Sequence, residues 1–196
     1  GQSAGAEYRV AAYRNRIDDY ISGLDISGSA AASSACGAAN AGACKLTVNI
    51  GQATISGFEA QGRLKVAAGQ WLNAGLSLLR GENDTLGEPL FQMPADELSL
   101  GWEGRVAEGW SADLTGRFVR EQTRVATVFA KGRENATAGF ATADLGATYR
   151  WQKQSVRVAV KNLADKGYHE HLAEGVSGQE IQAPGRSLQL SWKGSF

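Results

Sequence analysis

Apolar and polar residues alternate strictly through the closing stretch of the chain, GRSLQLSWKGSF (185–196). Leu188, Leu190 and Trp192 share one parity, and the final residue, Phe196, falls on the same parity. A period of two places the two sets of side chains on opposite faces of a β-strand. The closing stretch therefore predicts a strand with one apolar face and one polar face.

The same alternation recurs in earlier segments of the chain. In residues 58–66, Leu64 and Val66 share a parity, whereas Arg63 and Lys65 take the other. An α-helix, with a period of 3.6 residues, would not separate the two sets in this way. The sequence predicts eight strands, over residues 7–22, 58–66, 71–79, 97–106, 110–118, 143–151, 155–162 and 185–196.

The first predicted strand, 7–22, is less regular than the others. Its apolar parity changes between Val10 and Ile17. An extra residue in one strand of a pair would shift the parity by one position. We therefore expect a β-bulge near Ala12.

The connections between the predicted strands alternate between short and long. The short connections follow residues 66, 106 and 151, and the long ones cover 23–45, 81–96, 124–142 and 169–185. Short periplasmic turns and long external loops are typical of outer-membrane β-barrels. All prolines fall in the long connections, where no ladder hydrogen bond is needed: Pro89, Pro94 and Pro184. The pattern predicts an all-β, antiparallel transmembrane barrel wall.

Aromatic residues lie at the ends of several predicted strands. Trp71, Trp110, Trp151 and Phe196 would gather at the short-turn end, where amphipathic rings favour the membrane interface. A soluble β-sandwich, whose core takes similar residues, remains the alternative.

The polar parity of the predicted strands carries charges of both signs. In a barrel these side chains would face the lumen, where water or a plug, a domain that fills the lumen, can satisfy them. A wide anion pore would favour one dominant sign. The residues concerned are Glu59, Arg63, Lys65, Glu103, Arg105, Asp113, Arg117, Asp144 and Arg150.

The composition limits the classes of partner that the chain is expected to bind. Its 196 residues carry 20 basic and 20 acidic side chains, so no net field favours nucleic acid. No stretch approaches the roughly 20 apolar residues of a membrane helix. The chain begins without Met and without a leader, so we expect either a mature form or a piece of a longer, exported protein.

Two cysteines, Cys36 and Cys44, bracket the small-residue loop CGAANAGAC. A local disulfide would suit an oxidising compartment. Two free thiols are the alternative, and a metal site would need further ligands at close spacing.

Several motifs resemble the C-terminal part of a TonB-dependent outer-membrane receptor. They are YRNRIDDYIS near the start, NIGQATISGFEAQGRLKV after the first long loop, VKNLADKGYHEHL late in the chain, and the closing APGRSLQLSWKGSF. In that family an Asn-Leu pair followed by Asp and Tyr precedes the last external loop, here Asn162, Leu163, Asp165 and Tyr168. The resemblance covers nearly all of residues 1–196.

The resemblance implies a function and partners. Such receptors have about 22 strands around a plugged lumen, so this chain would supply the last eight strands, without the plug. The family imports scarce ligands, including metal chelates such as siderophores, using energy delivered through TonB. The terminal Phe196 would be the signal read by the barrel-assembly machinery, and bilayer lipid would surround the strands. The location implied is the bacterial outer membrane.

Two histidines in YHEHL are candidate metal ligands. His169 and His171 would point the same way on a strand, with Glu170 between them and Met93 in another long connection. The stretch also resembles the receptor branch assigned to copper. A polar strand end that faces the external vestibule is the plainer interpretation, because short motifs often match by chance.

Two further interpretations remain open. A membrane hydrolase could combine His171 with Asp165 and Ser177, although nothing in the sequence orients them. A complete small eight-stranded barrel with a structural or anchoring role would use the same alternation. No enzyme and no bound cofactor are expected, and the sequence does not name the transported ligand.

Overall fold

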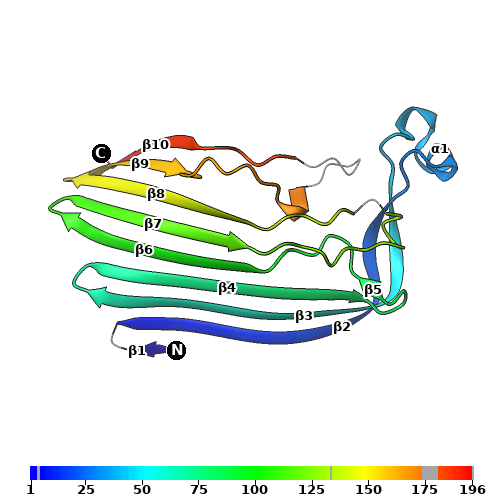
Figure 1. The fold of residues 1–196 in the computed structure, drawn as a ribbon, viewed down its shortest axis with the longest axis horizontal. Helices are drawn as coiled ribbons and strands as arrows, with labels where there is room; N and C mark the ends of the chain where they lie inside the picture. The colour runs from blue at the N-terminus through cyan, green and yellow to red at the C-terminus, as the bar shows by residue number, and fades with distance from the viewer. Residues whose placement is uncertain (4, 133, 174–180, 196) are drawn as a thin grey trace.

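The chain forms one antiparallel sheet with long strands (Figure 1). The computed structural model describes residues 1–3, 5–132, 134–173 and 181–195. Its strands are β1 (Gln2–Ser3), β2 (Ala6–Asp25), β3 (Lys45–Ala67), β4 (Gln70–Asn83), β5 (Glu88–Pro89), β6 (Glu97–Ala107), β7 (Trp110–Val119), β8 (Phe140–Trp151), β9 (Gln154–Lys161) and β10 (Ser187–Gly194). The helical segments are α1 (Ala30–Cys36), η1 (Ala38–Asn40) and η2 (His171–Ala173).

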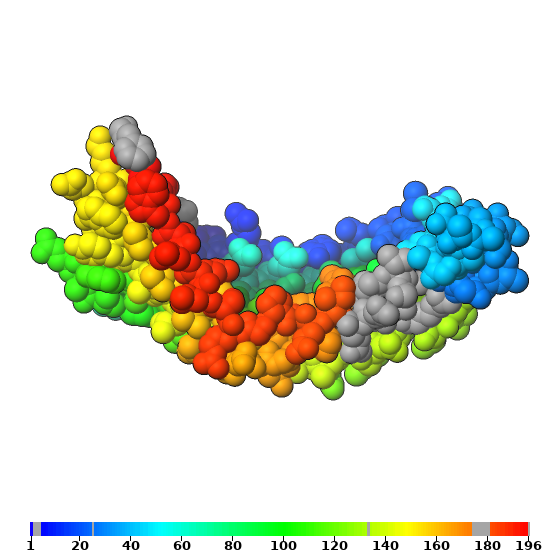
Figure 2. All heavy atoms as spheres, turned by 90° about the horizontal axis from the view of Figure 1, so that it is seen from above, coloured from blue at the N-terminus to red at the C-terminus, as the bar shows by residue number. Residues whose placement is uncertain are grey.

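The eight predicted strands correspond to β2, β3, β4 and β6–β10, and they are confirmed. The sheet order is β1-β2-β3-β4-β6-β7-β8-β9-β10, with β5 paired to β4. Each long strand pairs with its neighbours in sequence. The sheet is curved into a shell that is hollowed on one face (Figure 2). Within the described residues, β10 pairs only with β9, so the sheet does not close into a barrel.

The alternation of short and long connections is also confirmed. Two-residue turns join β3 to β4, β6 to β7 and β8 to β9, all at one end of the sheet (Figure 1). Gly69 and Gly109 take φ values of 70° and 72° in two of these turns, a region that favours glycine. The long connections lie at the opposite end, where β2 and β3 extend beyond the other strands and carry α1 (Figure 1).

The expected bulge near Ala12 is wrong. The β2–β3 register runs without a shift from the pair Ala6 and Leu64 to the pair Asp18 and Gln52. The apolar parity changes because β2 continues past the lipid-facing region, where its other face meets the loops. There Ile17 lies opposite Ala53, which belongs to a buried cluster.

That cluster is formed on the hollow side, at the loop-bearing end. Ala53 and Ile50 of β3 pack with buried apolar residues from the two long connections that follow β4 and β7. These residues are Leu90, Met93, Ala126, Phe129 and Ala130. A second, smaller cluster of Ile26, Ala32 and Cys44 lies beneath α1. The buried core therefore sits among the loops and not between two sheets.

The convex face of the sheet is apolar and exposed. Leu64, Leu100 and Leu114 expose 50%, 47% and 43% of their surfaces, although each lies in a regular, paired strand. In a sandwich these side chains would be buried against a second sheet, and the described residues form only one. The soluble-sandwich alternative is therefore wrong, and the exposed face fits lipid contact.

Aromatic residues gather at the short-turn end as expected, with one correction. The Trp110 and Tyr149 rings lie 4.8 Å apart, and those of Tyr149 and Trp151 lie 5.5 Å apart. Trp71, however, occupies the hollow face, where the Arg63 guanidinium lies 4.2 Å from its ring centroid. The strand parity places Trp71 with Asn73 and not with Leu72. Phe196 lies outside the described residues.

The extension of β2 and β3 is closed by a disulfide between Cys36 and Cys44, with their Cα atoms 6.0 Å apart. The Ser27 hydroxyl accepts a hydrogen bond of 2.6 Å from the Cys44 amide. Within the described residues, no helix has the length and apolar character needed to cross a membrane.

The two faces of β7 allow a direct test of the lipid assignment. Leu114 lies midway between Trp110 and Phe118 on the exposed apolar face, whereas Thr115 lies on the hollow face. Leu114→Arg should destabilise the folded barrel by about 2–4 kcal/mol, the cost of a charge at the bilayer midplane. Thr115→Arg, the matched control, should cost less than about 1 kcal/mol because the hollow face is wet. Unfolding in lipid vesicles measures both, and equal losses would contradict the assignment.

The disulfide gives a second prediction. We expect Cys36 and Cys44 to be joined in protein taken from its native compartment, because exported proteins fold under oxidising conditions. Peptide mapping without reductant should recover one cross-linked peptide, which reductant separates. Two alkylated cysteines in unreduced protein would refute the pairing.

Candidate functional site: the hollow face and its loops

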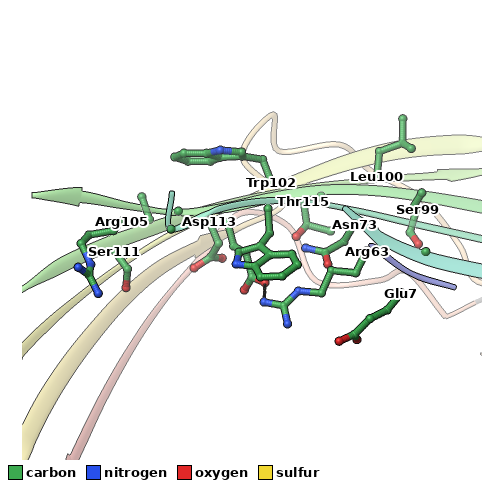
Figure 3. Close-up of a pocket in the computed structure, with 18 of the residues that line it drawn as sticks. Glu7, Arg63, Asn73, Ser99, Leu100, Trp102, Arg105, Ser111, Asp113 and Thr115 are labelled. Carbon is green, nitrogen blue, oxygen red and sulfur yellow. Dashed lines mark hydrogen bonds and ion pairs between the residues drawn. The ribbon is translucent and has the colours of Figure 1, made fainter. Parts of the chain in front are cut away.

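Polar side chains line the hollow face of the sheet. Figure 3 shows Arg63, Asp113 and Thr115 projecting to one side, whereas Leu100 and Trp102 project to the other. The lining also includes Glu103, Arg105, Arg150 and Arg157. The alternation predicted from the sequence therefore separates a wet, concave face from an apolar, convex one.

Ion pairs cross this face between strands that are not direct neighbours. The Arg157 guanidinium of β9 donates to both Asp113 carboxylate oxygens of β7, one at 2.9 Å. It passes over β8 at Gly146, where a Cβ atom would lie 2.3 Å from an Arg157 nitrogen. Arg63 of β3 similarly reaches Glu103 of β6. Glycine at position 146 thus permits the Arg157–Asp113 pair to form across an intervening strand.

The charges of the hollow wall are largely balanced by one another. Arg63 with Glu103, Arg157 with Asp113, and Lys161 with Asp144 each unite opposite signs. These pairs are partly exposed, so each contributes little to folding stability. Their effect is to leave a wall with local polarity and no dominant sign.

A buried carboxylate, Glu88 of β5, joins the two long connections that follow β4 and β7. It is 8% exposed and accepts backbone hydrogen bonds from Thr127, Val128 and Phe129 at 2.7–2.8 Å. The Thr127 hydroxyl adds a bond of 3.0 Å. Burial alone would raise the pKa of the Glu88 carboxyl, but these donors favour the ionised form and hold its pKa below the usual range.

A second buried carboxylate, Glu134, links the connection that follows β9 to the connections that follow β4 and β7. It accepts a hydrogen bond of 2.6 Å from the Gln92 amide and another from the Ala126 amide. The His171 Nε2 atom lies 3.2 Å from Glu134 Oε1, and Thr137 Oγ1 lies 3.2 Å from His171 Nδ1. Three long loops therefore meet at one buried site.

Other parts of the YHEHL stretch hold the same loop to the barrel wall. The Arg117 guanidinium of β7 binds the carboxylates of Glu170 and Glu97. The Tyr168 ring stacks on Phe140 at a centroid distance of 4.1 Å. The stretch thus anchors the final loop through a ring, a carboxylate and an imidazole.

The Asn-Leu motif forms the turn at which this loop begins. The Asn162 side chain accepts a hydrogen bond from the Lys166 amide and donates to the carbonyls of Lys166 and Pro184. The Asp165 carboxylate accepts a bond of 2.7 Å from the Arg186 amide. These contacts pin both ends of the loop, which explains why amide and carboxylate side chains occupy these positions.

The structure places the candidate metal ligands in separate roles. His171 lies in η2 and not on a strand, and both of its ring nitrogens contact protein groups. His169 forms an isolated bridge with Gln182, and Met93 is buried in the apolar cluster. In the described part of the chain, no group of three or more potential ligands among His, Cys, Asp and Glu comes together. Metal binding by His169 and His171 stays a prediction.

Of the three residues considered above for a membrane hydrolase, the two that the structure describes, His171 and Asp165, do not form a catalytic arrangement. His171 contacts Glu134 and Thr137, whereas the Asp165 carboxylate binds the Arg186 amide. Ser177 lies outside the described residues.

Sequence reasoning missed Glu88, Glu134 and Gln122, the polar residues that hold the loops together. Gln122 donates hydrogen bonds to the carbonyls of Met93 and Pro94 at 2.9 and 3.0 Å. Their partners are mostly backbone groups distant in sequence, so no local motif marks them. The neighbouring apolar run ATVFA (126–130) was the available signal that this loop is packed.

The contacts of Glu88 lead to a prediction about acid. Because its pKa is depressed in the folded state, its stabilisation is complete above the ordinary value of 4.5 and is lost as the pH falls through the folded value. Glu88→Gln should destabilise the loop by about 1.5–3 kcal/mol at neutral pH, the range for bonds to a charged group. Hydrogen exchange of amides 127–129, corrected for intrinsic rates, should be faster in this variant, and the difference from wild type should shrink in acid. Glu108→Gln, at an exposed short turn, should change nothing. A pH-independent difference would contradict the role of ionisation.

Comparison with known proteins identifies the family and the fold. Residues 2–163 match the family described as TonB dependent receptor-like, beta-barrel. The fold is similar to a copper transporter, OprC, at 23% identity and a TM-score of 0.80, over 97% of this chain and 27% of that one. It is also similar to the siderophore receptor PirA from Acinetobacter baumannii, at 18% identity and a TM-score of 0.72, over 100% of this chain and 30% of that one. A search of curated proteins finds no match.

A third similar structure is a ferric enterobactin receptor, PfeA, from Pseudomonas aeruginosa, at 21% identity and a TM-score of 0.69, over 100% of this chain and 29% of that one. The chain thus spans less than a third of the length of these structures. Barrels of this family lie in the outer membrane of Gram-negative bacteria, which confirms the expected location. Since the family match extends over most of the sequence, the chain belongs to the TonB-dependent receptor-like β-barrels.

Proposed function

We propose that residues 1–196 are the C-terminal barrel portion of an active outer-membrane importer of a metal or metal chelate. The observation that carries the proposal is the curved, unclosed sheet of the receptor-barrel family, with a polar, charge-balanced hollow face. Similar structures are named as a copper transporter and as siderophore receptors. Copper is one candidate cargo and a ferric siderophore is the other.

The barrel portion is not expected to transport by itself. A plug from elsewhere in the protein would fill the lumen and receive energy through TonB. The balanced ion pairs of the hollow wall support this arrangement, because a wall without a dominant sign can face another folded domain without strong repulsion. Enzymatic activity and a resident cofactor form no part of the proposal.

The three-loop junction supports a role at the external entrance. Glu88, Glu134 and His171 hold the connections after β4, β7 and β9 in one body. Loops fixed in this way can present a shaped surface to a ligand at a small entropic cost. We place selectivity in these loops together with the plug, and His169 remains the candidate metal ligand there.

Two partners follow from the same proposal. Bilayer lipid would cover the convex face, and the barrel-assembly machinery would read Phe196 at the end of the last strand. A complete small eight-stranded barrel is the competing proposal. It would require β10 to pair with the first strands, a pairing absent from the described residues.

Uptake measurements in the bacterium that encodes the chain test the importer. Deleting the gene should reduce uptake of radiolabelled copper or of a ferric siderophore, and deleting TonB should reduce it to the same level. Uptake of a small sugar through porins serves as the control and should not change. Unchanged uptake of every metal form, or uptake that persists fully without TonB, would contradict the proposal. The intact native protein should also be far larger than 20.7 kDa, whereas a mass near that value would favour the small barrel.

A further inference from the structure

Three strand pairs of the sheet are not joined by a turn at the short-turn end. They are β4–β6, β7–β8 and β9–β10, which are connected only through the long segments 84–96, 120–139 and 162–186. We call each of these pairs a seam. The two-residue turns set the register within the hairpins β3–β4, β6–β7 and β8–β9. A long loop does not set a register, so at the seams it must come from contacts between the strands.

The three seams share one backbone geometry at the short-turn end. In each seam, the second residue of the turn accepts a hydrogen bond from an amide across the seam. The donors and acceptors are Arg105 and Gly69 at 2.9 Å, Arg150 and Gly109 at 2.8 Å, and Ser195 and Lys153 at 3.3 Å. The first residue of β4, β7 or β9 then lies opposite the residue that precedes the donor. The side chains in this last row can therefore be compared between seams.

A glutamine closes the last row of the β4–β6 seam. Gln70 lies opposite Gly104, and its Oε1 atom accepts a hydrogen bond of 2.9 Å from the Trp102 indole Nε1–H. The Gln70 amide nitrogen donates to the Arg105 carbonyl at 2.7 Å. A Cβ atom on Gly104 would lie 2.0 Å from Gln70 Oε1, so glycine leaves the room that the glutamine occupies. Both hydrogen bonds of the Gln70 side chain thus join β4 to β6.

The β9–β10 seam repeats this arrangement. Gln154 lies opposite Gly194, and its Oε1 atom accepts a hydrogen bond of 3.2 Å from the Trp192 indole Nε1–H. In both seams the tryptophan precedes the glycine by two residues, in WEG (102–104) and WKG (192–194). These are the two occurrences of Trp-x-Gly in the sequence. We call the pairs Gln70–Trp102 and Gln154–Trp192 the seam clasps.

The other strand pairs show where a clasp is absent. In the β7–β8 seam, the last row holds Trp110 and Tyr149, whose rings lie 4.8 Å apart. The β2–β3 pair ends in Ala6 and Leu64, which carry no polar side-chain groups. Its ladder, however, is more than twice as long as that of β4–β6. Side-chain clasps therefore occur where a short ladder leaves the register less strongly determined.

The lipid-facing position of the clasps explains how they select a register. Gln70 shares its parity with Leu72, and Figure 3 shows Trp102 on the side opposite to the polar hollow face. An amide or an indole N–H without a partner in apolar surroundings costs free energy. A slip of one residue would move Trp102 to the hollow face and separate it from Gln70. Only the observed register therefore satisfies both groups.

We propose that Gln70 and Gln154 are register-setting residues that hold neighbouring strands together at the short-turn end by binding Trp102 and Trp192. The two tryptophans lie at the aromatic edge of the sheet, but their indole donors are bound by the protein and not by lipid headgroups. The proposal rests on the strand topology and does not depend on the cargo of the importer.

Hydrogen exchange of backbone amides in the whole folded receptor, in detergent micelles, tests the β4–β6 clasp. The variants are Gln70→Leu, Trp102→Phe, which keeps an aromatic ring without the donor, and the double variant. A glutamine that merely faced lipid could be replaced by leucine without loss, because leucine suits an apolar surface better. Peptides that cover 102–105 report on the clasp, and peptides that cover 97–99 report on the loop-bearing end of the same strand.

We expect Gln70→Leu to speed exchange at 102–105 about tenfold, because two hydrogen bonds across the seam are lost. Trp102→Phe should speed it about threefold, because one is lost. The double variant should match Gln70→Leu at about tenfold, whereas independent effects would multiply to about thirtyfold. Exchange at 97–99 should not change. The same substitution on the hollow face, Gln61→Leu, should leave both segments unchanged.

Three results would overturn the proposal. They are unchanged or slower exchange at 102–105 in Gln70→Leu, a multiplied effect in the double variant, and equal acceleration at 97–99, which would indicate general loosening. Heat-modifiable mobility on gels establishes that each variant is folded. Gln154→Leu and Trp192→Phe repeat the measurement at the β9–β10 seam, so the proposal stays testable if Gln70→Leu does not fold. The same coupling is expected there, and its absence would equally count against the clasps.

Discussion

Backbone hydrogen bonding in lipid is the constraint on which the rest of this structure depends. A bilayer offers no water to unpaired amide and carbonyl groups, so strands must pair along their whole membrane-spanning length. The antiparallel ladder from β2 to β10 meets this demand by pairing each long strand with its sequence neighbours. Once the register is set, the face on which each side chain lies is also set. Leu114 lies on the lipid-facing side of the sheet, and Thr115 lies on the hollow face. Within the described residues, β10 pairs on one side only, with β9.

The same demand for paired polar groups organises the two regions that lipid does not reach. On the hollow face, charges pair with one another across intervening strands, and Gly146 leaves room for Arg157 to do so. Above the membrane, buried carboxylates take up backbone amides that irregular loops cannot pair among themselves. Glu88 and Glu134 thus accept hydrogen bonds from backbone amides of the loops, just as the ladder satisfies the backbone amides of the strands. The YHEHL stretch belongs to this network, and its main role there is to hold the final loop in place.

The errors of sequence reasoning have particular physical causes. Trp71 was assigned to the lipid interface by its residue type, yet its odd position in β4 places it over Arg63 on the hollow face. The parity change near Ile17 indicated a bulge, but the register is continuous and the surroundings of β2 change instead. Both errors arose where residue type and parity disagreed, and parity was the better guide for Trp71.

The sequence by itself determined the strands, their two faces, the alternation of short and long connections, and the family resemblance. These features are local: a period of two and a turn of a few residues can be read within ten positions. Tertiary structure alone decided how the long loops meet, with Glu134 of one loop contacting Gln92 and His171 of two others. It also decided that Met93 is buried and that Arg157 reaches Asp113 over β8. Those contacts join residues far apart in the chain, and their energies depend on burial that no local pattern encodes.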